Sequence, residues 1–305
     1  MESTRTYATQ ARPLIFGEVL FDAFPDGQAV MGGAPFNVAW HLQGFGAKPL
    51  LISRVGCDRP GQTVLDSLRD WGMDATGIQV DADLPTGRVQ IALHDGTHSF
   101  DILTDQAYDR IDAQTALDAA RAVRPALLYC GSLITRAAAS RAALTALREA
   151  VTAPLFVDIN LREPWWERTR VETLMQAARW LKLNDDELTA LRGPSDSLPA
   201  AEAQAAHLRE ACGLDWVILT RGVEGASCIG PETLRGQAPA VTQLVDSVGA
   251  GDAFSAVTLL GLLRGWDWGL TLSRALGFAA RICEQRGATQ PDAALYAGLR
   301  EAWKL

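Results

Sequence analysis

The chain has 305 residues, a length that fits one large α/β domain or two smaller domains. Its 48% hydrophobic and 21% charged residues are ordinary for a globular protein. The formal net charge of -8 argues against a nucleic-acid-binding protein, which needs clustered Lys and Arg. The five cysteines are scattered without a CxxC pair, so neither a zinc site nor a disulfide framework is legible. Residues 1–12 lack an apolar signal segment and no apolar run is long enough to cross a membrane, so we expect a cytoplasmic protein.

The first elements predicted along the chain are a buried strand and an extended continuation. Residues 13–17 form a short apolar run that ends in glycine, and residues 18–22 continue extended with two acids. Open α/β sheets bind ligands at the carboxyl ends of their strands. Residues 32–37 (GGAPFN) then predict a loop that leads into a helix ending at Gly44 or Gly46.

The next segments contain one antiparallel insertion. A strand is predicted over 49–55, followed by a helix that Gly72 ends. Residues 88–93 then alternate in polarity, Asp95-Gly96 is a strong hairpin signal, and residues 99–103 form the returning strand. Because a hairpin is foreign to a βαβ chain, we interpret it as a lid.

Regular alternation of strands and helices resumes in the second half. Alanine-rich helical stretches separate four strand-like segments, which are 126–129, 155–159, 180–183 and 216–219. This order predicts the α/β class, with a doubly wound, mostly parallel sheet flanked by helices.

A glycine-rich turn and an isolated carboxylate, in the segment 246–254 (DSVGAGDAF), lie directly before an apolar helix. Apolar residues occupy nearly the full circumference of 252–264, so we expect a buried helix whose free N–H groups offer an anion site. A carboxylate there repels an anion unless it accepts a proton while the anion is transferred. The working hypothesis is phosphoryl transfer to a hydroxyl with Asp252 as general base. The alternative is a loop whose glycines allow tight packing and whose Asp252 caps the helix.

Two pairs of polar residues each allow a functional and a structural interpretation. Asp22 and Asn37 could hold sugar hydroxyls, or they could be a turn residue and a helix-capping residue. Glu187 could hold the waters of a bound Mg²⁺, with Asn184 touching phosphate or the same shell. The alternative for Asn184 and Glu187 is a capped helix with acids in its first turn, which the residues alone favour.

Two further segments end predicted strands. Residues 219–226 (LTRGVEGA) could cradle a nucleotide or form an ordinary turn between strands. Arg162 is the expected cation for an anionic group at the edge of the site, although surface arginines are far commoner. No Walker A string occurs in the chain, which excludes a P-loop kinase.

Together these motifs resemble the PfkB/ribokinase family of sugar kinases. The amino-terminal signature of that family is matched by 32–39 (GGAPFNVA) and continues to 54–58. Its carboxyl-terminal signature, written DTxGAGD, is matched by 246–252, where Ser247 replaces the common threonine and keeps the hydroxyl. Within the family, the segments 17–22 and 32–37 look most like those of bacterial fructokinases.

The resemblance implies a ribokinase-like fold and ATP-dependent phosphorylation of a sugar hydroxyl. We expect one domain over 1–305, with a small β lid formed by about 18–31 and 86–106. The family often uses this lid to pair subunits, so a homodimer is expected through it. Fructose is the first expected acceptor, and 2-keto-3-deoxygluconate or ribose are the alternatives. Outside the enzymes, the competing hypothesis is a non-catalytic sugar or nucleotide sensor on the same fold.

The resemblance also implies a role for each motif residue. Asp252 is the base, and the anion hole is formed by Gly249, Ala250 and Gly251. The sugar is held by Asp22, Gly32, Gly33 and Asn37. ATP is bordered by Asn184, Thr220, Gly222 and Gly225, with Glu187 serving Mg²⁺ through water. The monovalent-cation loop that binds K⁺ in some members is resembled by Asp246, Val248 and Gly287.

Overall fold

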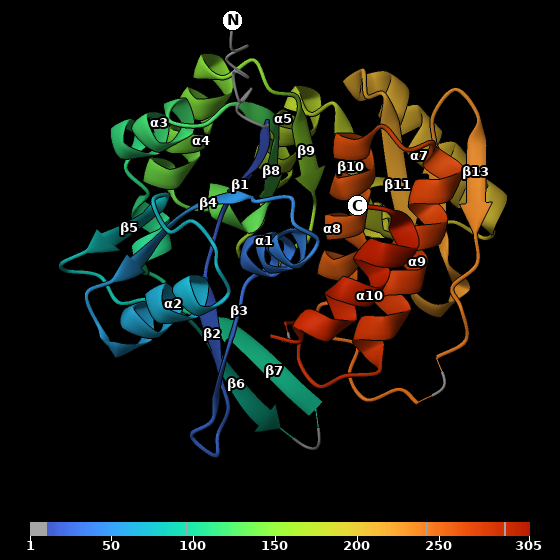
Figure 1. Cartoon of the computed structure of the whole chain (residues 1–305). Helices are drawn as coiled ribbons and strands as arrows, with labels where there is room; N and C mark the ends of the chain where they lie inside the picture. The colour runs from blue at the N-terminus through green and yellow to red at the C-terminus, as the bar shows by residue number, and fades with distance from the viewer. Residues whose placement is uncertain (1–10, 95–96, 242, 290) are drawn as a thin grey trace, which may run out of the picture.

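The computed structural model describes residues 11–94, 97–241, 243–289 and 291–305. Within these residues, nine strands form the central sheet, in which the β11–β12 and β12–β13 pairs are antiparallel and every other neighbouring pair is parallel (Figure 1). In sheet order the strands are β13 (Thr233–Gly236), β12 (Ala226–Ile229), β11 (Trp216–Thr220), β10 (Trp180–Asn184), β9 (Leu155–Asp158), β8 (Pro125–Gly131), β1 (Arg12–Phe16), β4 (Leu50–Gly56) and β5 (Ile78–Asp81). The predicted mostly parallel sheet is confirmed.

Helices cover both faces of this sheet. Because both faces are buried, the sequences of its strands are continuous runs of apolar residues. One face carries α3 (Ala113–Arg121), α4 (Ala138–Ala150), α5 (Arg168–Ala177), α6 (Asp185–Arg192) and α7 (Leu198–Cys212). The other face carries α1 (Ala34–Gly44), α2 (Arg59–Asp70), α8 (Ala250–Arg264), α9 (Trp268–Cys283) and α10 (Ala293–Trp303). Each set packs on its own hydrophobic core, so the sheet separates two cores and the chain is doubly wound as predicted.

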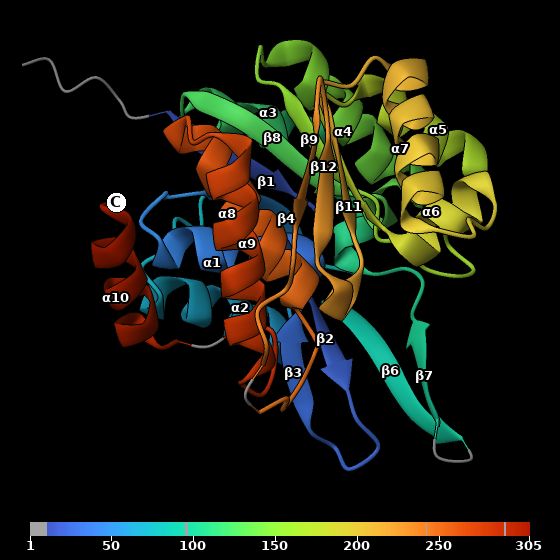
Figure 2. The same ribbon diagram turned by 90° about the vertical axis from the view of Figure 1, so that its right-hand side faces the viewer.

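A second, four-stranded sheet projects from one end of the body (Figure 2). Its strands, in sheet order, are β3 (Ala29–Gly32), β2 (Leu20–Ala23), β6 (Gly87–His94) and β7 (Thr97–Ile102). The antiparallel pairing of β6 with β7 confirms the predicted hairpin, whose turn signal Asp95-Gly96 lies outside the described residues. The extended segment after β1 does not continue the central sheet, because β2 pairs with β3 and β6 instead.

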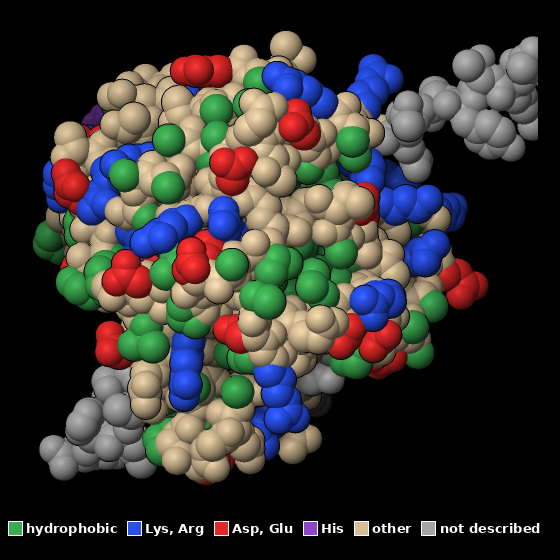
Figure 3. Space-filling model, turned by 90° about the vertical axis from the view of Figure 1, so that its left-hand side faces the viewer, with side chains coloured by type: hydrophobic (Ala, Val, Ile, Leu, Met, Phe, Trp, Pro, Cys, Tyr) green, Lys and Arg blue, Asp and Glu red, His purple; other side chains and the backbone are tan. Residues whose placement is uncertain are grey.

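Short 3-10 helices lie near the ends of the strands. They are η1 (Ala107–Arg110), η2 (Leu133–Thr135) and η3 (Gly222–Glu224). On the face drawn in Figure 3, acidic and basic side chains are interspersed without an extended patch of either sign. Among the described helices, none combines the length and the apolar character that a bilayer crossing requires.

Candidate active site

The carboxyl ends of the parallel strands meet at the end of the body from which the small sheet projects. Glu18 follows β1, Asp158 ends β9, Asn184 ends β10 and Thr220 ends β11. Residues from widely separated parts of the chain are therefore gathered at one edge. This edge is where open α/β sheets bind their ligands.

Two helices begin at this edge and bring the two sequence signatures into contact. Asn37, in the first turn of α1, donates a hydrogen bond of 2.7 Å from Nδ2 to Oδ2 of Asp252, in the first turn of α8. A Cβ built on Gly32 would lie 3.7 Å from Oδ2 of Asp22 and 4.0 Å from Oδ1 of Asn37. The structure thus groups Asp22, Gly32, Asn37 and Asp252. Its geometry does not match the capping alternative for Asp252, because no side chain caps α8.

Gly249 and Gly33 are required by backbone geometry at these two helix entries. Gly249 precedes α8 with a φ of 80°, and a Cβ there would lie 2.3 Å from the Cβ of Ala288. Gly33 precedes α1 with a φ of 107°, and a Cβ there would lie 2.7 Å from the carbonyl oxygen of Glu18. Both close approaches exclude any larger residue. In the first turn of α8, the N–H of Ala250 donates to the carbonyl oxygen of Ser247 at 3.3 Å, and the first bond along the helix runs from the N–H of Ala253 to the carbonyl oxygen of Gly249 at 2.8 Å. The N–H groups of Gly251 and Asp252 lie before that bond, where a helix start can bind an anion.

Burial changes the proton affinity of the carboxyl group of Asp252. Burial raises its pKa to about 6, while the hydrogen bond from Asn37 works in the opposite direction. The charge on Asp158 also raises this pKa, and the charges on Lys182 and Arg162 lower it. A carboxyl group with such a pKa is largely ionised at neutral pH and still holds a proton well enough to serve as a base.

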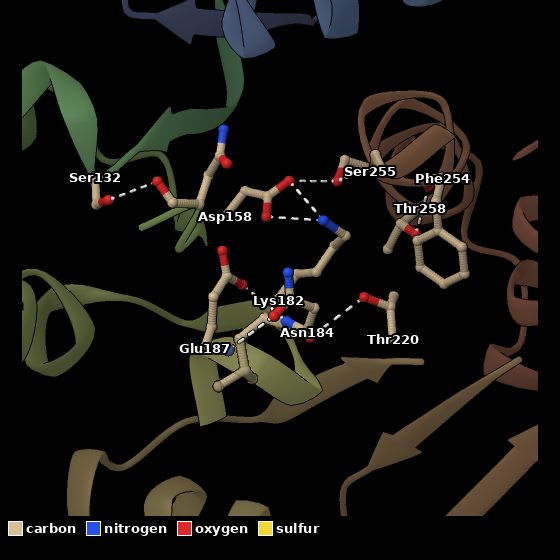
Figure 4. Close-up of polar contacts among 12 residues, drawn as sticks. Ser132, Asp158, Lys182, Asn184, Glu187, Thr220, Phe254, Ser255 and Thr258 are labelled. Carbon is tan, nitrogen blue, oxygen red and sulfur yellow. Dashed lines mark hydrogen bonds and ion pairs between the residues drawn. The ribbon is translucent and has the colours of Figure 1, made fainter. Parts of the chain in front are cut away.

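Beneath the first turn of α8 lies a buried ion pair (Figure 4). Nζ of Lys182 is 2.8 Å from Oδ1 and 2.9 Å from Oδ2 of Asp158, and Oγ of Ser255 donates to the same Oδ2 at 2.7 Å. A Cβ built on Gly251 would lie 3.6 Å from Nζ of Lys182. Burial opposes the charged form of Lys182, but the attraction of Asp158 prevails and raises the pKa of the ammonium. A permanent positive charge therefore supports the N-terminal end of α8.

Asn184 and Glu187 form the capping box of α6. Oδ1 of Asn184 accepts a hydrogen bond from the N–H of Glu187 at 2.8 Å, and Oε2 of Glu187 accepts one from the N–H of Asn184 at 2.8 Å. Oε1 of Glu187 accepts another from the N–H of Leu161 at 3.0 Å. The capped helix is what the structure contains, and each Glu187 oxygen keeps a second lone pair. Burial raises the pKa of Glu187, although the charge on Lys182 lowers it.

The segment after β11 forms a tight turn through η3 into the antiparallel strand β12. A Cβ on Gly225 would lie 2.0 Å from the carbonyl oxygen of Gly236, so Gly225 permits the approach of β13. Gly222 has a φ of 51° and open space around it, and Thr220 pairs with Asn184 across the sheet. The structure contains the turn that the residues alone favoured, with Thr220 and Gly222 at the edge of the site.

Arg162 lies just beyond β9 and is exposed. Its charge lowers the pKa values of Glu18, Asp22 and Asp252, which locates the guanidinium near all three carboxyl groups. In the described ranges Arg162 forms no ion pair. Its guanidinium is therefore exposed and unpaired among the described ion pairs, and the role predicted for it toward an anionic group stays a prediction.

Asp246 organises the loop that leads into α8. Its Oδ1 accepts a hydrogen bond from the N–H of Val248 at 3.0 Å, and its Oδ2 accepts one from the N–H of Gly287 at 3.1 Å. The three residues predicted as a monovalent-cation loop are thus neighbours. In the described part of the chain, no three His, Cys, Asp or Glu side chains are grouped as a metal site.

Lys182 and Glu18 lie at the site, but no catalytic or binding role was predicted for them from the sequence. A lysine between Leu181 and Leu183 in an apolar strand was a usable signal, since only a partnered lysine is tolerated there. Glu18 is 2% exposed, and burial raises its pKa to about 7. Nothing in the local pattern marked Glu18 as buried, because its burial depends on the loop at Gly33.

Comparison with known proteins agrees with this geometry. The profile of the pfkB family carbohydrate kinases matches residues 10–294. This chain belongs to the pfkB family. The pfkB kinase described here is 29% identical to a fructokinase from Escherichia coli over 83% of this chain and 84% of that protein. It is 27% identical to a probable fructokinase-5 from Arabidopsis thaliana, over 90% of this chain and 93% of the relative.

Solved structures resemble this pfkB kinase over nearly its whole length. A fructokinase double mutant from Vibrio cholerae, in its fructose, ADP and potassium ion bound form, superposes with a TM-score of 0.77 at 26% identity. That comparison covers 95% of this chain and 98% of the other. A fructokinase with bound ATP from Xylella fastidiosa has a TM-score of 0.81 at 22% identity, covers 97% of this chain and 100% of its own, and supports the ribokinase-like fold alone. The predicted family and fold class are confirmed.

Proposed function

We propose that this pfkB kinase transfers the terminal phosphoryl group of ATP to a hydroxyl group of fructose, giving fructose 6-phosphate. The observation that carries this proposal is the contact between Asn37 and Asp252 at the N-terminal end of α8. It joins a polar loop suited to sugar hydroxyls to a carboxylate beside an anion-binding helix end. The fructose-bound relative from Vibrio cholerae supports fructose as the acceptor.

The proposed reaction depends on positioning and charge stabilisation, as phosphoryl transfer generally does. Asp252 accepts the proton of the attacking hydroxyl as the bond from its oxygen to the terminal phosphorus forms and the bond to the leaving ADP oxygen breaks. The N-terminal end of α8 at Gly249, Ala250 and Gly251, chiefly the N–H group of Gly251, and the buried charge of Lys182 stabilise the phosphoryl group in transit. Asp22, Gly32, Gly33 and Asn37 hold the sugar, and Arg162 balances negative charge between sugar and nucleotide.

Nucleotide and cations have their own proposed positions. Asn184, Thr220, Gly222 and Gly225 border ATP. Glu187 fits a water-mediated Mg²⁺ site, since it has free lone pairs and Mg²⁺ keeps several waters beside phosphates. The loop of Asp246, Val248 and Gly287 is proposed for K⁺, supported by the potassium ion in the relative from Vibrio cholerae.

We also propose that residues 1–305 act as one domain with a lid, formed by about 18–31 and 86–106. The strands of the small sheet lie in these segments and project beside the site. Two apolar side chains on them, Val30 and Phe100, are exposed at 43% and 61%. Their exposure supports pairing of two copies through the lid.

Coupled measurement of ADP release tests the function directly. The purified chain is given ATP, Mg²⁺ and, in turn, fructose, ribose, 2-keto-3-deoxygluconate and no sugar. We expect turnover with fructose to exceed the no-sugar rate by orders of magnitude. Faster turnover with another sugar would reassign the acceptor, and tight ATP binding without phosphorylation of any sugar would support a non-catalytic sensor.

A further inference from the structure

Three of the buried polar atoms that have no hydrogen-bond partner within the described residues lie close to the proposed sugar site. They are Oε2 of Glu18, the hydroxyl group of Tyr108 and Nη1 of Arg136. Tyr108 is fully buried, Glu18 is 2% exposed, and the Arg136 side chain is 5% exposed. Buried polar groups in folded proteins are nearly always hydrogen-bonded, so three exceptions at one place call for an explanation.

The direction of Nη1 is fixed by the other contacts of Arg136. Nε and Nη2 donate to the two oxygens of Asp109, both at 2.8 Å, and Nη2 also donates to the carbonyl oxygen of Leu103 at 2.7 Å. The guanidinium lies over the rings of Tyr108 and Trp165, 5.0 and 4.8 Å from their centroids. Asp109, Leu103, Tyr108 and Trp165 thus fix the position of this side chain. Nη1 is the only guanidinium nitrogen to which these contacts give no hydrogen-bond acceptor among the described residues.

The ring of Tyr108 and the backbone of Val19, the residue after Glu18, both lie against Gly87 at the base of the small sheet. A Cβ on Gly87, the first residue of β6, would lie 2.8 Å from the ring of Tyr108 and 2.6 Å from the carbonyl oxygen of Val19. Glu18, the neighbour of Val19, in turn packs against Gly33 in the proposed sugar loop. The charges on Arg136 and Asp252 both affect the pKa of Glu18. The three unpartnered atoms are therefore continuous with the proposed sugar site.

The chemistry of the three groups favours hydroxyls as their partner. Arg136 offers an N–H, Glu18 a carboxyl oxygen, and Tyr108 a hydroxyl that both donates and accepts. The charge of Arg136 is already neutralised by Asp109. Among these three side chains a carboxylate ligand would thus find no positive charge that is not already neutralised, and it would face Glu18. The exposed Arg162, whose charge also lowers the pKa of Glu18, lies outside the three.

We propose that Glu18, Tyr108 and Arg136 form a subsite at the base of the lid for hydroxyl groups of an uncharged acceptor sugar, and that this subsite discriminates against sugar acids. This inference rests on the proposed kinase function and names the substrate class of the same site. The base of the lid covers the three atoms in the ligand-free chain, with Leu103 against Arg136 and Gly87 against Tyr108. Opening of the lid uncovers them, as lids do in other enzymes.

Tyr108→Phe is the decisive variant, because it removes only the unpartnered hydroxyl. If the hydroxyl serves the sugar alone, the ligand-free variant keeps or raises its Tm, while the KM for fructose rises about tenfold and the KM for ATP stays constant. Tenfold corresponds to about 1.4 kcal/mol. A KM for fructose within twofold of the wild type would overturn the subsite.

Tyr296→Phe is the matched control. Tyr296 is also buried, but its hydroxyl has a partner in the protein, because it lies 2.8 Å from Nδ1 of His41. Losing that hydrogen bond should lower the Tm and leave both KM values unchanged. The opposite responses of two buried tyrosines separate a ligand-binding hydroxyl from a structural one.

Calorimetric binding of fructose and of 2-keto-3-deoxygluconate separates this inference from the proposed function. Fructose binding that weakens in Tyr108→Phe supports the subsite even if no phosphate is transferred, a result that would overturn the kinase function alone. Tighter binding of the sugar acid, or no binding of any neutral sugar, overturns the subsite whatever the turnover.

Discussion

Nδ2 of Asn37 lies 2.7 Å from Oδ2 of Asp252, although 215 residues separate them in the chain. The bond ties the loop proposed for the sugar to the proposed base. It also favours the ionised form of the carboxyl group, against the larger effect of burial. A change at Asn37 should therefore alter the protonation of Asp252.

We predict that kcat falls as the pH drops through about 6, because a base must be deprotonated and the pKa of Asp252 is raised to about 6. In Asn37→Ala the hydrogen bond that lowers this pKa is gone, so the acidic limb of the kcat profile should move to higher pH. Measuring kcat at saturating sugar from pH 5 to 9, for the wild type and for Asn37→Ala, tests both the position of the acidic limb and its shift. An unmoved limb in Asn37→Ala would argue that another group titrates.

Asp252→Asn should lower kcat by about 10²–10⁴, the usual contribution of a general base, and leave the affinity for ATP unchanged. The amide oxygen can still accept the hydrogen bond from Asn37, so the fold is preserved. Steady-state kinetics and nucleotide titration test this. A variant retaining more than a tenth of the wild-type kcat would remove Asp252 from the role of base.

The same substitution should stabilise the protein at alkaline pH. The pKa of Asp252 rises from its ordinary 3.8 to about 6 on folding, so the folded state binds the proton more tightly. The stability from this group is complete below pH 3.8 and is lost as the pH rises through 6. Asp252→Asn should therefore raise the free energy of unfolding at pH 8, by at most about 3 kcal/mol, and change little near pH 4. Denaturant titrations at both pH values compare the two proteins.

Lys182→Met should reduce both stability and rate. It leaves Asp158 buried without its cation, a loss of about 3–5 kcal/mol in comparable ion pairs. The double variant Lys182→Met with Asp158→Asn should recover much of the Tm, because no charge is left unpaired. If Lys182 supports the phosphoryl group, kcat stays low in the double variant. Recovery of kcat together with the Tm would show a purely structural role.

Gly249→Ala and Gly265→Ala compare the two ends of α8. Both residues have positive φ values, 80° and 66°, so alanine is strained by about 1–2 kcal/mol at either position. Only at Gly249 would the new Cβ overlap a neighbour, Ala288. We expect Gly265→Ala to cost stability alone and Gly249→Ala to cost more stability and most of the activity. Equal effects on kcat would contradict the anion-hole geometry.

Local pattern was sufficient to predict most of the fold. Neighbouring residues alone determine several of its features. These are the apolar strands, the glycines at which helices end, and the alternating polarity over 88–93. The antiparallel strands β12 and β13 were not predicted. β12 begins inside the segment 219–226, which was interpreted as a nucleotide loop or a turn, and β13 is only partly buried and has no continuous apolar run.

The site was predictable only in part, for a different reason. Asp252 and Asn37 lie in motifs whose spacing is visible in the sequence. The pairing of Lys182 with Asp158 depends on the adjacency of β10 and β9, and the burial of Glu18 depends on a loop fifteen residues away. Contacts of this kind depend on which segments lie side by side in the folded protein, and the local sequence does not determine that. Glu187 illustrates the converse, because its role as a capping residue follows from the local sequence, while the role predicted for it toward Mg²⁺ stays a prediction.

Helices α1 and α8 both begin at the site and pack against each other in one core. The proposed proton acceptor and the proposed sugar loop are therefore parts of a single rigid body. The small sheet and the residues after β8 lie outside this helix pair. New acceptor preferences can evolve by substitution in those outer segments while the chemistry at α8 stays intact. The division explains how one scaffold can accommodate many sugars, and it tells a protein engineer where to randomise first.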